Sequence, residues 1–340
     1  MSLKRVSLLI MVVAVALLTT NCAPAATPQP TEVAKEAPFV YAFFATPVEE
    51  PWVSVIKTAM DEAQAAGKVQ WKYVDDLGYA GDLERVMREV IEKEKPDAIF
   101  GESFGNEEAV RSVARDYPDL PFVIGSGLGP ADPNYAVFDN WIHEAGYLAG
   151  IIAGGMTQSD VIGVVGGYPV PEVNRIINAF IDGVHEVNPD AKVLVTFINS
   201  WFDPPAAKEA ALAQIDAGAD VMYAERFGVI EAADERDVWA IGMMADQYDL
   251  APEHVLTSVT WNMRPTVDYA LQQINAGTFV AQDLKDFSMM AKGGAMLAPY
   301  HGMEKNIPED VLKLVEQKKD EIEKGLFRVN IDEAQPAGSQ

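Results

Sequence analysis

The chain of 340 residues has one cysteine, four histidines and few basic residues. A single cysteine cannot form an internal disulfide, and the histidines are too scattered along the chain to show metal-ligand spacing. Lysines and arginines number 26 against 51 aspartates and glutamates, and the net charge of −25 disfavours binding to nucleic acid or to an anionic membrane surface. We therefore expect no metal, no cofactor and no nucleic-acid partner.

Phosphate-binding loops are also missing from the sequence. No Gly-x-x-x-x-Gly-Lys-Ser/Thr segment occurs. The glycines at 125–129 are followed by the proline-containing segment 130–133 rather than by a helix, so no helix N-terminus can meet a pyrophosphate there. A dinucleotide-binding loop is therefore not expected.

The first residues form a targeting segment. Lys4 and Arg5 precede the apolar run Val6–Leu18, and about 13 residues are too short to span a bilayer. No second hydrophobic segment is long enough to do so. This pattern is typical of a signal peptide, which we place at residues 1–21.

Cys22 follows the predicted signal peptide directly, at a position that resembles the cleavage and lipidation site of bacterial lipoproteins. The alternative is an ordinary secretory signal that is cut nearby, after Ala25 or Ala26. Either processing takes the mature protein out of the cytoplasm. Residues 22–38 are rich in Ala, Pro, Thr and Glu, which cannot bury a core, and are predicted to form a linker.

The remaining sequence alternates strands with helical runs. Its length favours two domains, and 49% hydrophobic with 23% charged residues is typical of a folded protein. The alternation runs twice, from about 39 to 157 and from about 160 to 260, which predicts two parallel sheets covered by helices. Elements beyond 260 suggest that the chain crosses back to the first sheet. Glycines in the helix 143–156 suggest close packing against a sheet.

The segment Val193–Pro205 shows where a ligand could bind. An apolar strand ends in Asn199-Ser200-Trp201-Phe202-Asp203-Pro204-Pro205, and a helix follows. In open α/β sheets, ligands bind outside the carboxyl ends of the strands. Within this loop Asp203, which precedes Pro204, is expected to shape the loop and cap the helix.

Aromatic side chains recur in the other loops that follow strands. Alone, each of them is more often a core residue than a ligand contact. If the two sheets face each other, their aromatic planes and one or two carboxylates line one cleft, which suits a flat, neutral, nitrogen-rich ligand. The acidic pair Glu49-Glu50 near Trp52 is expected to be solvated. The side chains in these loops are Trp52, Ser103 with Phe104, Trp201, Phe227, Asp246 and Trp261.

The segment Gly101-Glu102-Ser103-Phe104-Gly105 supports an enzymatic alternative. It fits the Gly-x-Ser-x-Gly nucleophile elbow between a strand and a helix, and His254 or His301 follows in the chain order of hydrolases. A secreted serine hydrolase using Ser103 is therefore the second hypothesis. The simpler interpretation is a glycine-flanked turn.

Several short segments carry a family likeness from about residue 39 to 300. The chain resembles the basic membrane protein (PnrA-like) family of ABC transporter substrate-binding lipoproteins, most closely a branch associated with purine bases and nucleosides. The segments that carry the resemblance are Ser103–Gly105, Tyr147–Gly150, Ile162–Val165, Pro169–Val173, Asn178–Phe180, Asn188–Asp190, Asn199–Pro204, Gly218–Asp220 and Thr260–Asn262.

The resemblance implies a two-lobed periplasmic-binding-protein type 1 fold with a three-segment hinge. Such a protein closes on one small-molecule ligand and presents it to a membrane permease, without catalysis and as a monomer. It implies an extracytoplasmic, lipid-anchored protein held by Cys22. The expected lobes are residues 39–157 with about 262–288, and residues 158–261 with about 289–335.

The resemblance also assigns the candidate ligand-binding residues. Trp52 and Phe104 are expected on the first lobe, and Trp201, Phe227 and Asp246 on the second. Close relatives carry other polar residues where this chain has Ile56-Lys57 and Glu225-Arg226, so polar recognition is expected to differ. The full set is Trp52, Ser103, Phe104, Trp201, Glu225, Phe227, Asp246, Trp261 (near the hinge) and Asn262.

Overall fold

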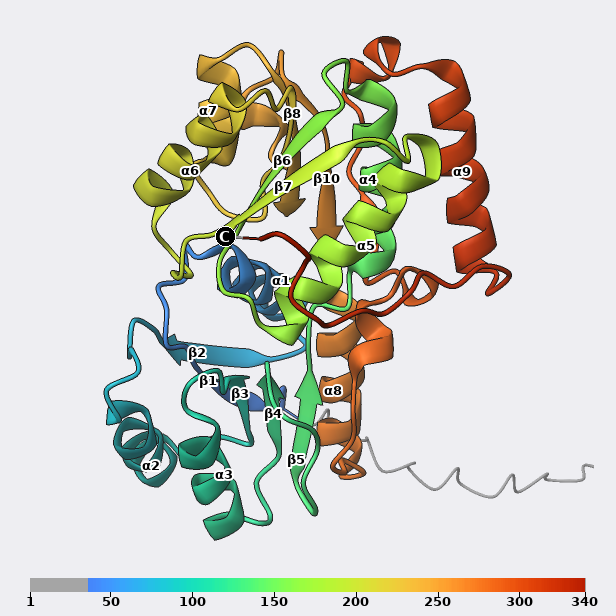
Figure 1. Cartoon of the computed structure of the whole chain (residues 1–340). Helices are drawn as coiled ribbons and strands as arrows, with labels where there is room; N and C mark the ends of the chain where they lie inside the picture. Colours follow the sequence, from blue (N-terminus) through green and yellow to red (C-terminus); the bar gives the residue numbers. More distant parts are fainter. Residues whose placement is uncertain (1–35, 340) are drawn as a thin grey trace, which may run out of the picture. The chain divides into compact units, whose positions relative to one another are not determined.

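The computed structural model describes residues 36–339 (Figure 1). The predicted signal peptide, Cys22 and nearly all of the predicted linker lie outside this range. Within it, none of the helices combines the length and the apolar character that crossing a membrane requires.

The first lobe is built on a five-stranded parallel sheet (Figure 1). Its strands are β1 (Phe39–Phe43), β2 (Gln70–Val74), β3 (Ala98–Glu102), β4 (Phe122–Gly125) and β5 (Tyr135–Phe138), in the order β2-β1-β3-β4-β5. Alternate strand residues face opposite sides. Phe43 and Ile99 pack on helices α2 (Asp82–Glu94) and α3 (Glu107–Asp116), whereas Phe100 packs on the side of helix α1 (Pro51–Ala65).

The second lobe is built on a six-stranded sheet in the order β11-β10-β9-β8-β6-β7. Its strands are β6 (Val161–Gly166), β7 (Lys192–Phe197), β8 (Val221–Tyr223), β9 (Trp239–Met244), β10 (Val255–Trp261) and β11 (Ala295–Leu297). All neighbours pair in parallel except β11, which runs antiparallel to β10. The predicted α/β architecture with two helix-covered, mainly parallel sheets is confirmed.

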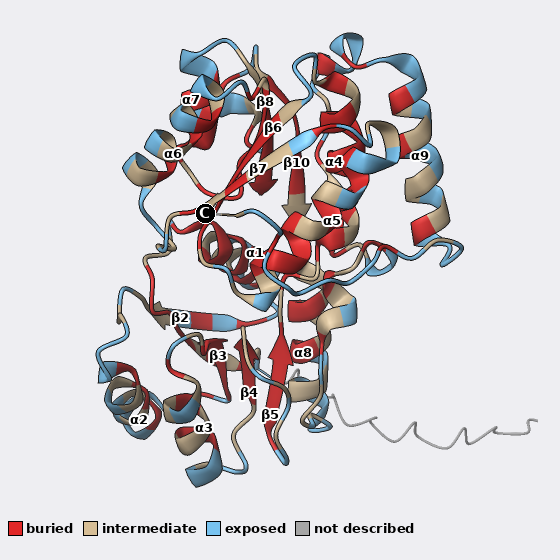
Figure 2. Ribbon diagram, viewed as in Figure 1, coloured by how far each residue is buried: buried red, intermediate tan, exposed pale blue. Residues whose placement is uncertain are grey.

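Helices cover both faces of the second sheet. Helices α6 (Pro204–Asp216) and α7 (Val229–Glu235) form one layer, and helices α4 (His143–Met156), α5 (Pro171–Val187) and α9 (Glu309–Glu323) lie on the other side. Figure 2 shows the strands and α4 as largely buried, with exposed residues on the outer helices. Asp203 caps α6, as predicted, because its carboxylate accepts a hydrogen bond from the Ala206 N–H at 3.1 Å.

Helix α4 contacts strands β8, β10 and β11 of the second sheet, as its glycines suggested, and it packs still more closely on helix α5. A side chain on Gly150 would collide with the carbonyl oxygen of Phe180 in α5, and one on Gly183 would collide with that of Tyr147 in α4. The two helices therefore approach at backbone contact. Their glycines signal close packing in the sequence, but they do not identify the partner.

The chain passes between the lobes three times. It leaves β5 for α4 at residues 139–142, leaves β10 for helix α8 (Arg264–Ala276) at 262–263, and returns to β11 through the short helices η2 (Lys285–Ser288) and η3 (Met290–Lys292). The remaining short helices are η1 (Tyr248–Leu250) and η4 (Met303–Asn306). Helix α4 was expected from the sequence to belong to the first lobe, but it packs on α5 and α9. We therefore propose that the first crossing precedes α4.

Candidate ligand-binding site

A pocket between the two lobes, which we call the central pocket, lies where strands of both sheets end. The empty space among its lining residues, counted together with the part open to solvent, is about 330 Å³. The first lobe contributes residues at or after the ends of β1, β3 and β4, and the second lobe contributes residues after β6, β7 and β8. This is the expected ligand position in open α/β sheets. The lining residues are Thr46, Glu50, Trp52, Glu102, Phe104, Ser126, Glu172, Trp201 and Arg226.

Aromatic rings from the two lobes meet at this pocket. The ring centroids of Phe104 in the first lobe and Trp201 in the second are 5.0 Å apart at an interplanar angle of 88°. Tyr168 packs on both rings, at 4.9 Å from Trp201 and 6.0 Å from Phe104. Because the two rings touch edge to face, a flat ligand can stack between them only if they separate.

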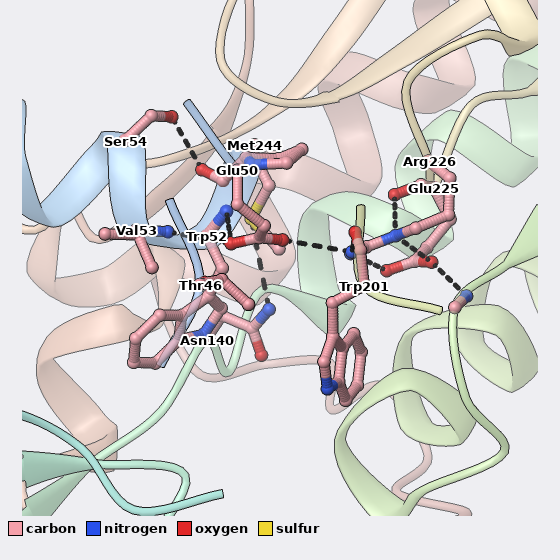
Figure 3. A network of polar contacts seen from close by, with 12 residues as sticks. Thr46, Glu50, Trp52, Val53, Ser54, Asn140, Trp201, Glu225, Arg226 and Met244 are labelled. Atoms are coloured by element: carbon pink, nitrogen blue, oxygen red, sulfur yellow. Dashed lines mark hydrogen bonds and ion pairs between the residues drawn. The ribbon is translucent and has the colours of Figure 1, made fainter. Parts of the chain in front are cut away.

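A buried ion-pair cluster, Glu50, Glu225 and Arg226, joins the lobes; we call it the Arg226 clasp (Figure 3). Arg226 donates to Glu50 of the first lobe at 3.0 Å and to Glu225 at 2.7 and 2.9 Å. It also donates to the Trp201 carbonyl oxygen at 2.8 Å. Each of the three side chains is at most 3% exposed. The clasp carries one positive and up to two negative charges.

Backbone amides complete the hydrogen bonding of the clasp. Glu50 caps helix α1 by accepting from the N–H groups of Trp52 and Val53 at 2.9 and 3.0 Å. Glu225 accepts from the Gly167 N–H at 2.9 Å. Burial raises the pKa of both carboxyl groups, and the nearby Arg226 guanidinium opposes this rise.

Two further carboxyl groups line the pocket, that of the buried Glu102 and that of the half-buried Glu172. Glu102 accepts from the Ala45 N–H at 2.6 Å, and burial raises its pKa to about 7. Glu172 accepts from the Ser126 hydroxyl at 3.1 Å, and burial, followed by the negative charge of Asp139, raises its pKa well above the usual range. The pocket is therefore rich in acceptors and unsuited to an anion.

Three of the predicted residues, Trp52, Phe104 and Trp201, meet in the central pocket. Trp52 also stacks on Phe138, with centroids 5.7 Å apart, so its ring is partly a core residue. Of the other predicted residues, Glu225 contributes to the clasp rather than to the pocket lining. Their roles in ligand binding stay predictions.

Ser103 and Phe227 lie outside the pocket lining. Ser103 is fully buried and donates to Glu107 at 2.6 Å and to the Gly125 carbonyl oxygen at 3.2 Å. Phe227 packs edge to face on Phe202 at 6.5 Å. Neither side chain is positioned by these contacts to meet a ligand in the central pocket.

The remaining predicted residues, Asp246, Trp261 and Asn262, line a different pocket of about 530 Å³ beside helix α1. Asp246 contacts His301 at 2.7 Å, and the Trp261 indole donates to Ser288 at 3.0 Å. Asn262 donates to the Gly293 carbonyl oxygen at 2.9 Å. The predicted ligand-binding residues therefore line two different pockets. The sequence shows that these residues lie near strand ends, but it does not show which strand ends share a pocket.

The sequence reasoning missed the polar part of the central pocket. Glu50 was expected to be solvated, but it is buried because it caps α1 and meets Arg226. Glu102 is the last residue of strand β3, and a position at a strand end indicates a possible ligand contact. Glu102 was not chosen because the segment 101–105 was interpreted only as a possible serine-nucleophile motif. For Thr46, Ser126 and Glu172 the sequence offered only their positions near strand ends or helix starts.

Ser103 has no histidine partner in the described part of the chain. His254 is held by Asp234 and Asp237 at 2.9 Å each, and His301 is held by Asp246. The Ser103 hydroxyl points to a carboxylate and a carbonyl oxygen inside the first lobe. The triad required of a serine hydrolase is therefore not assembled.

Comparisons with known proteins show the family to which this chain belongs. Residues 48–321 match the family described as ABC transporter substrate-binding protein PnrA-like. A purine-binding protein of Brucella abortus (strain 2308) is 32% identical over 260 residues, covering 76% of this chain and 72% of that protein. A proposed ABC transporter glucose-binding protein of Haloferax volcanii is 34% identical over 229 residues, covering 66% of this chain and 58% of that protein.

A solved structure shares the fold. An ABC transporter solute-binding protein from Aeropyrum pernix K1 superimposes with a TM-score of 0.76 at 20% identity, over 86% of this chain and 94% of that chain. At this identity the similarity concerns the fold alone. It agrees with two lobes of helix-covered sheets around an interlobe pocket.

Proposed function

Because this chain belongs to the PnrA-like family of ABC transporter substrate-binding proteins, we propose that it binds a purine base or nucleoside in the central pocket and delivers it to the permease of an ABC importer. The family is one of ABC transporter substrate-binding proteins, so the chain is a binding protein and not an enzyme. The serine-hydrolase alternative has no support.

The lining of the central pocket carries the ligand proposal. Phe104 and Trp201 approach from opposite lobes and offer two aromatic surfaces to a flat ring. The carboxyl groups of the buried Glu102 and the half-buried Glu172 offer acceptor oxygens to N–H groups. A purine combines a flat ring with N–H donors, and the name of the Brucella abortus relative supports the same class.

A sugar is the competing ligand, since the name of the Haloferax volcanii relative proposes glucose. Hexoses present many hydroxyl groups and require several side chains that can both donate and accept. The guanidinium of Arg226 is already engaged by Glu50, Glu225 and the Trp201 carbonyl oxygen. Only two lining side chains, Thr46 and Ser126, carry hydroxyl groups that can both donate and accept, and the rest of the lining is aromatic and acidic. The aromatic surfaces of the two lobes favour a purine.

Isothermal titration calorimetry tests the ligand class with adenine, guanine, hypoxanthine, urate, adenosine, guanosine and glucose. We expect saturable binding at one site for at least one purine and none for glucose. Saturable binding of glucose without binding of any purine would refute the purine assignment while leaving the transport role in place.

We also propose that the exported chain is held at the membrane by a lipid on Cys22. Membrane-fraction assays of the wild-type chain and of Cys22→Ser in a bacterial host that processes lipoproteins test this. The wild type should sediment with membranes and label with radioactive palmitate, whereas Cys22→Ser should do neither. Unlabelled, freely released wild-type protein would favour an ordinary secretory signal.

A further inference from the structure

The central pocket contains polar groups that the folded chain does not satisfy. Within residues 36–339, the Thr46 hydroxyl and the Trp52 indole N–H are buried without a hydrogen-bond partner. Their residues are only 9% and 6% exposed, and both line the pocket. A buried donor left without a partner destabilises the fold, so such groups are rare unless a ligand or a water satisfies them.

Glu102 adds an acceptor to these two groups. Its Oε1 accepts from the backbone N–H groups of Ala45 at 2.6 Å and Thr46 at 3.4 Å. These two donors fix the orientation of the carboxyl group at the end of β3. In the described part of the chain Oε2 accepts no hydrogen bond and no basic side chain forms an ion pair with Glu102. One oxygen is therefore structural, and the other remains available on a residue that lines the pocket.

The geometry points to Glu102 as the residue that recognises the ligand: its Oε2 accepts a hydrogen bond from a ligand N–H group. The Trp52 indole N–H donates to a neighbouring acceptor atom of the ligand. This inference rests on the proposed purine ligand and names the residues that recognise it. The pocket selects a neutral heterocycle that presents a donor beside an acceptor, as aminopurines do, and rejects anionic ligands such as urate or nucleotides.

The charges around Glu102 agree with this selection. The titratable and charged groups near it are Glu50, Tyr79, Glu172 and Arg226, and the charge of Arg226 is shared by the clasp. A negatively charged ligand would therefore meet uncompensated carboxyl groups in a buried site. An N–H donor instead forms a charge-assisted hydrogen bond with an ionised Glu102, which is about twice as strong as a neutral one.

The substitution Glu102→Gln tests the inference. Because the N–H groups of Ala45 and Thr46 require an acceptor, the glutamine carbonyl should take the place of Oε1. The amide NH₂ then replaces Oε2 and turns the pocket acceptor into a donor. We expect affinity for the best aminopurine to fall by roughly ten- to a hundredfold, since hydrogen bonds to charged groups are worth that much in binding.

Matched ligands separate recognition from a structural effect. Purine lacks the 6-amino group of adenine, hypoxanthine lacks the 2-amino group of guanine, and 9-methyladenine lacks the ring N–H. In the wild type, a ligand that lacks the N–H group bound by Glu102 should bind more weakly than its parent ligand. In Glu102→Gln the two ligands should bind with almost equal affinity. Thermal melting of the variant checks that it is folded.

Glu108→Gln is the control. This substitution makes the same chemical change on the surface of helix α3, where the Glu108 side chain is 81% exposed. Its affinities should match those of the wild type. Unchanged affinities in Glu102→Gln, or an equal loss for every ligand, would overturn the role of Glu102 while keeping the purine assignment. A wild-type protein that binds no purine would overturn both.

Discussion

Replacing Arg226 with methionine removes the cation of the Arg226 clasp and leaves Glu50 and Glu225 facing each other without it. In the closed structure both carboxyl groups are buried, and Arg226 donates to each of them. Methionine keeps an unbranched, flexible side chain but supplies neither charge nor donor. The closed arrangement of the lobes should therefore lose free energy relative to an open one.

The magnitude follows from the burial of the pair. Removing one partner of a buried ion pair costs about 3–5 kcal/mol, because the remaining charge stays desolvated. Separation of the lobes relieves this cost by returning Glu50 to water. The closed-to-open ratio should fall by roughly two to four orders of magnitude, and apparent ligand affinity should fall with the fraction of closed molecules.

Small-angle X-ray scattering of the ligand-free protein measures the effect. We expect Arg226→Met to have a larger radius of gyration than the wild type at pH 8. Burial raises the pKa of Glu50 and Glu225 in the closed form, and the loss of Arg226 raises it further. The closed form then binds more protons than the open form, so lowering the pH should shift the variant back toward the closed form.

Arg236→Met provides the matched control, because Arg236 forms a partly exposed ion pair with Asp216 on the same lobe. Exposed pairs contribute little, so this variant should scatter and bind like the wild type. If Arg226→Met keeps the wild-type radius of gyration and ligand affinity at pH 8, the clasp does not hold the lobes together and the reasoning fails.

Three further predictions concern stacking, protonation and capping. Trp201→Ala should weaken purine binding by about 1–3 kcal/mol in calorimetry. Phe202→Ala in the same loop should leave purine binding unchanged, and equal losses of affinity in the two variants would argue against stacking on Trp201. Aminopurine affinity of the wild type should rise from pH 6 to pH 8, because the Glu102 carboxyl with its pKa of about 7 accepts best when ionised; a flat profile would contradict this. Asp203→Ala should lower the free energy of unfolding in urea by about 1 kcal/mol through loss of the α6 cap, and a selective loss of ligand affinity would instead make it a contact.

The sequence alone was sufficient for the architecture and the family. Strands such as β7 are recognisable because β-branched residues cluster in short runs, and the helices between them repeat apolar residues at helical spacing. These patterns are local in the sequence, so they can be recognised without knowing the tertiary contacts. The family likeness adds segments spread over most of the chain. Position at strand ends also predicted that Trp52, Phe104 and Trp201 would share a site, and they line one pocket.

Only the tertiary structure decided which strand ends meet. Asp246 and Asn262 also follow strands, and Trp261 ends β10, but all three line a separate pocket beside α1. Glu50 and Arg226 are 176 residues apart, and each has the appearance of an ordinary loop charge in the sequence. Their pairing depends on two lobes that approach each other, and no local pattern encodes that approach. The polar chemistry of the pocket is therefore a property of the folded protein, because burial and charge pairing arise only when distant segments come together.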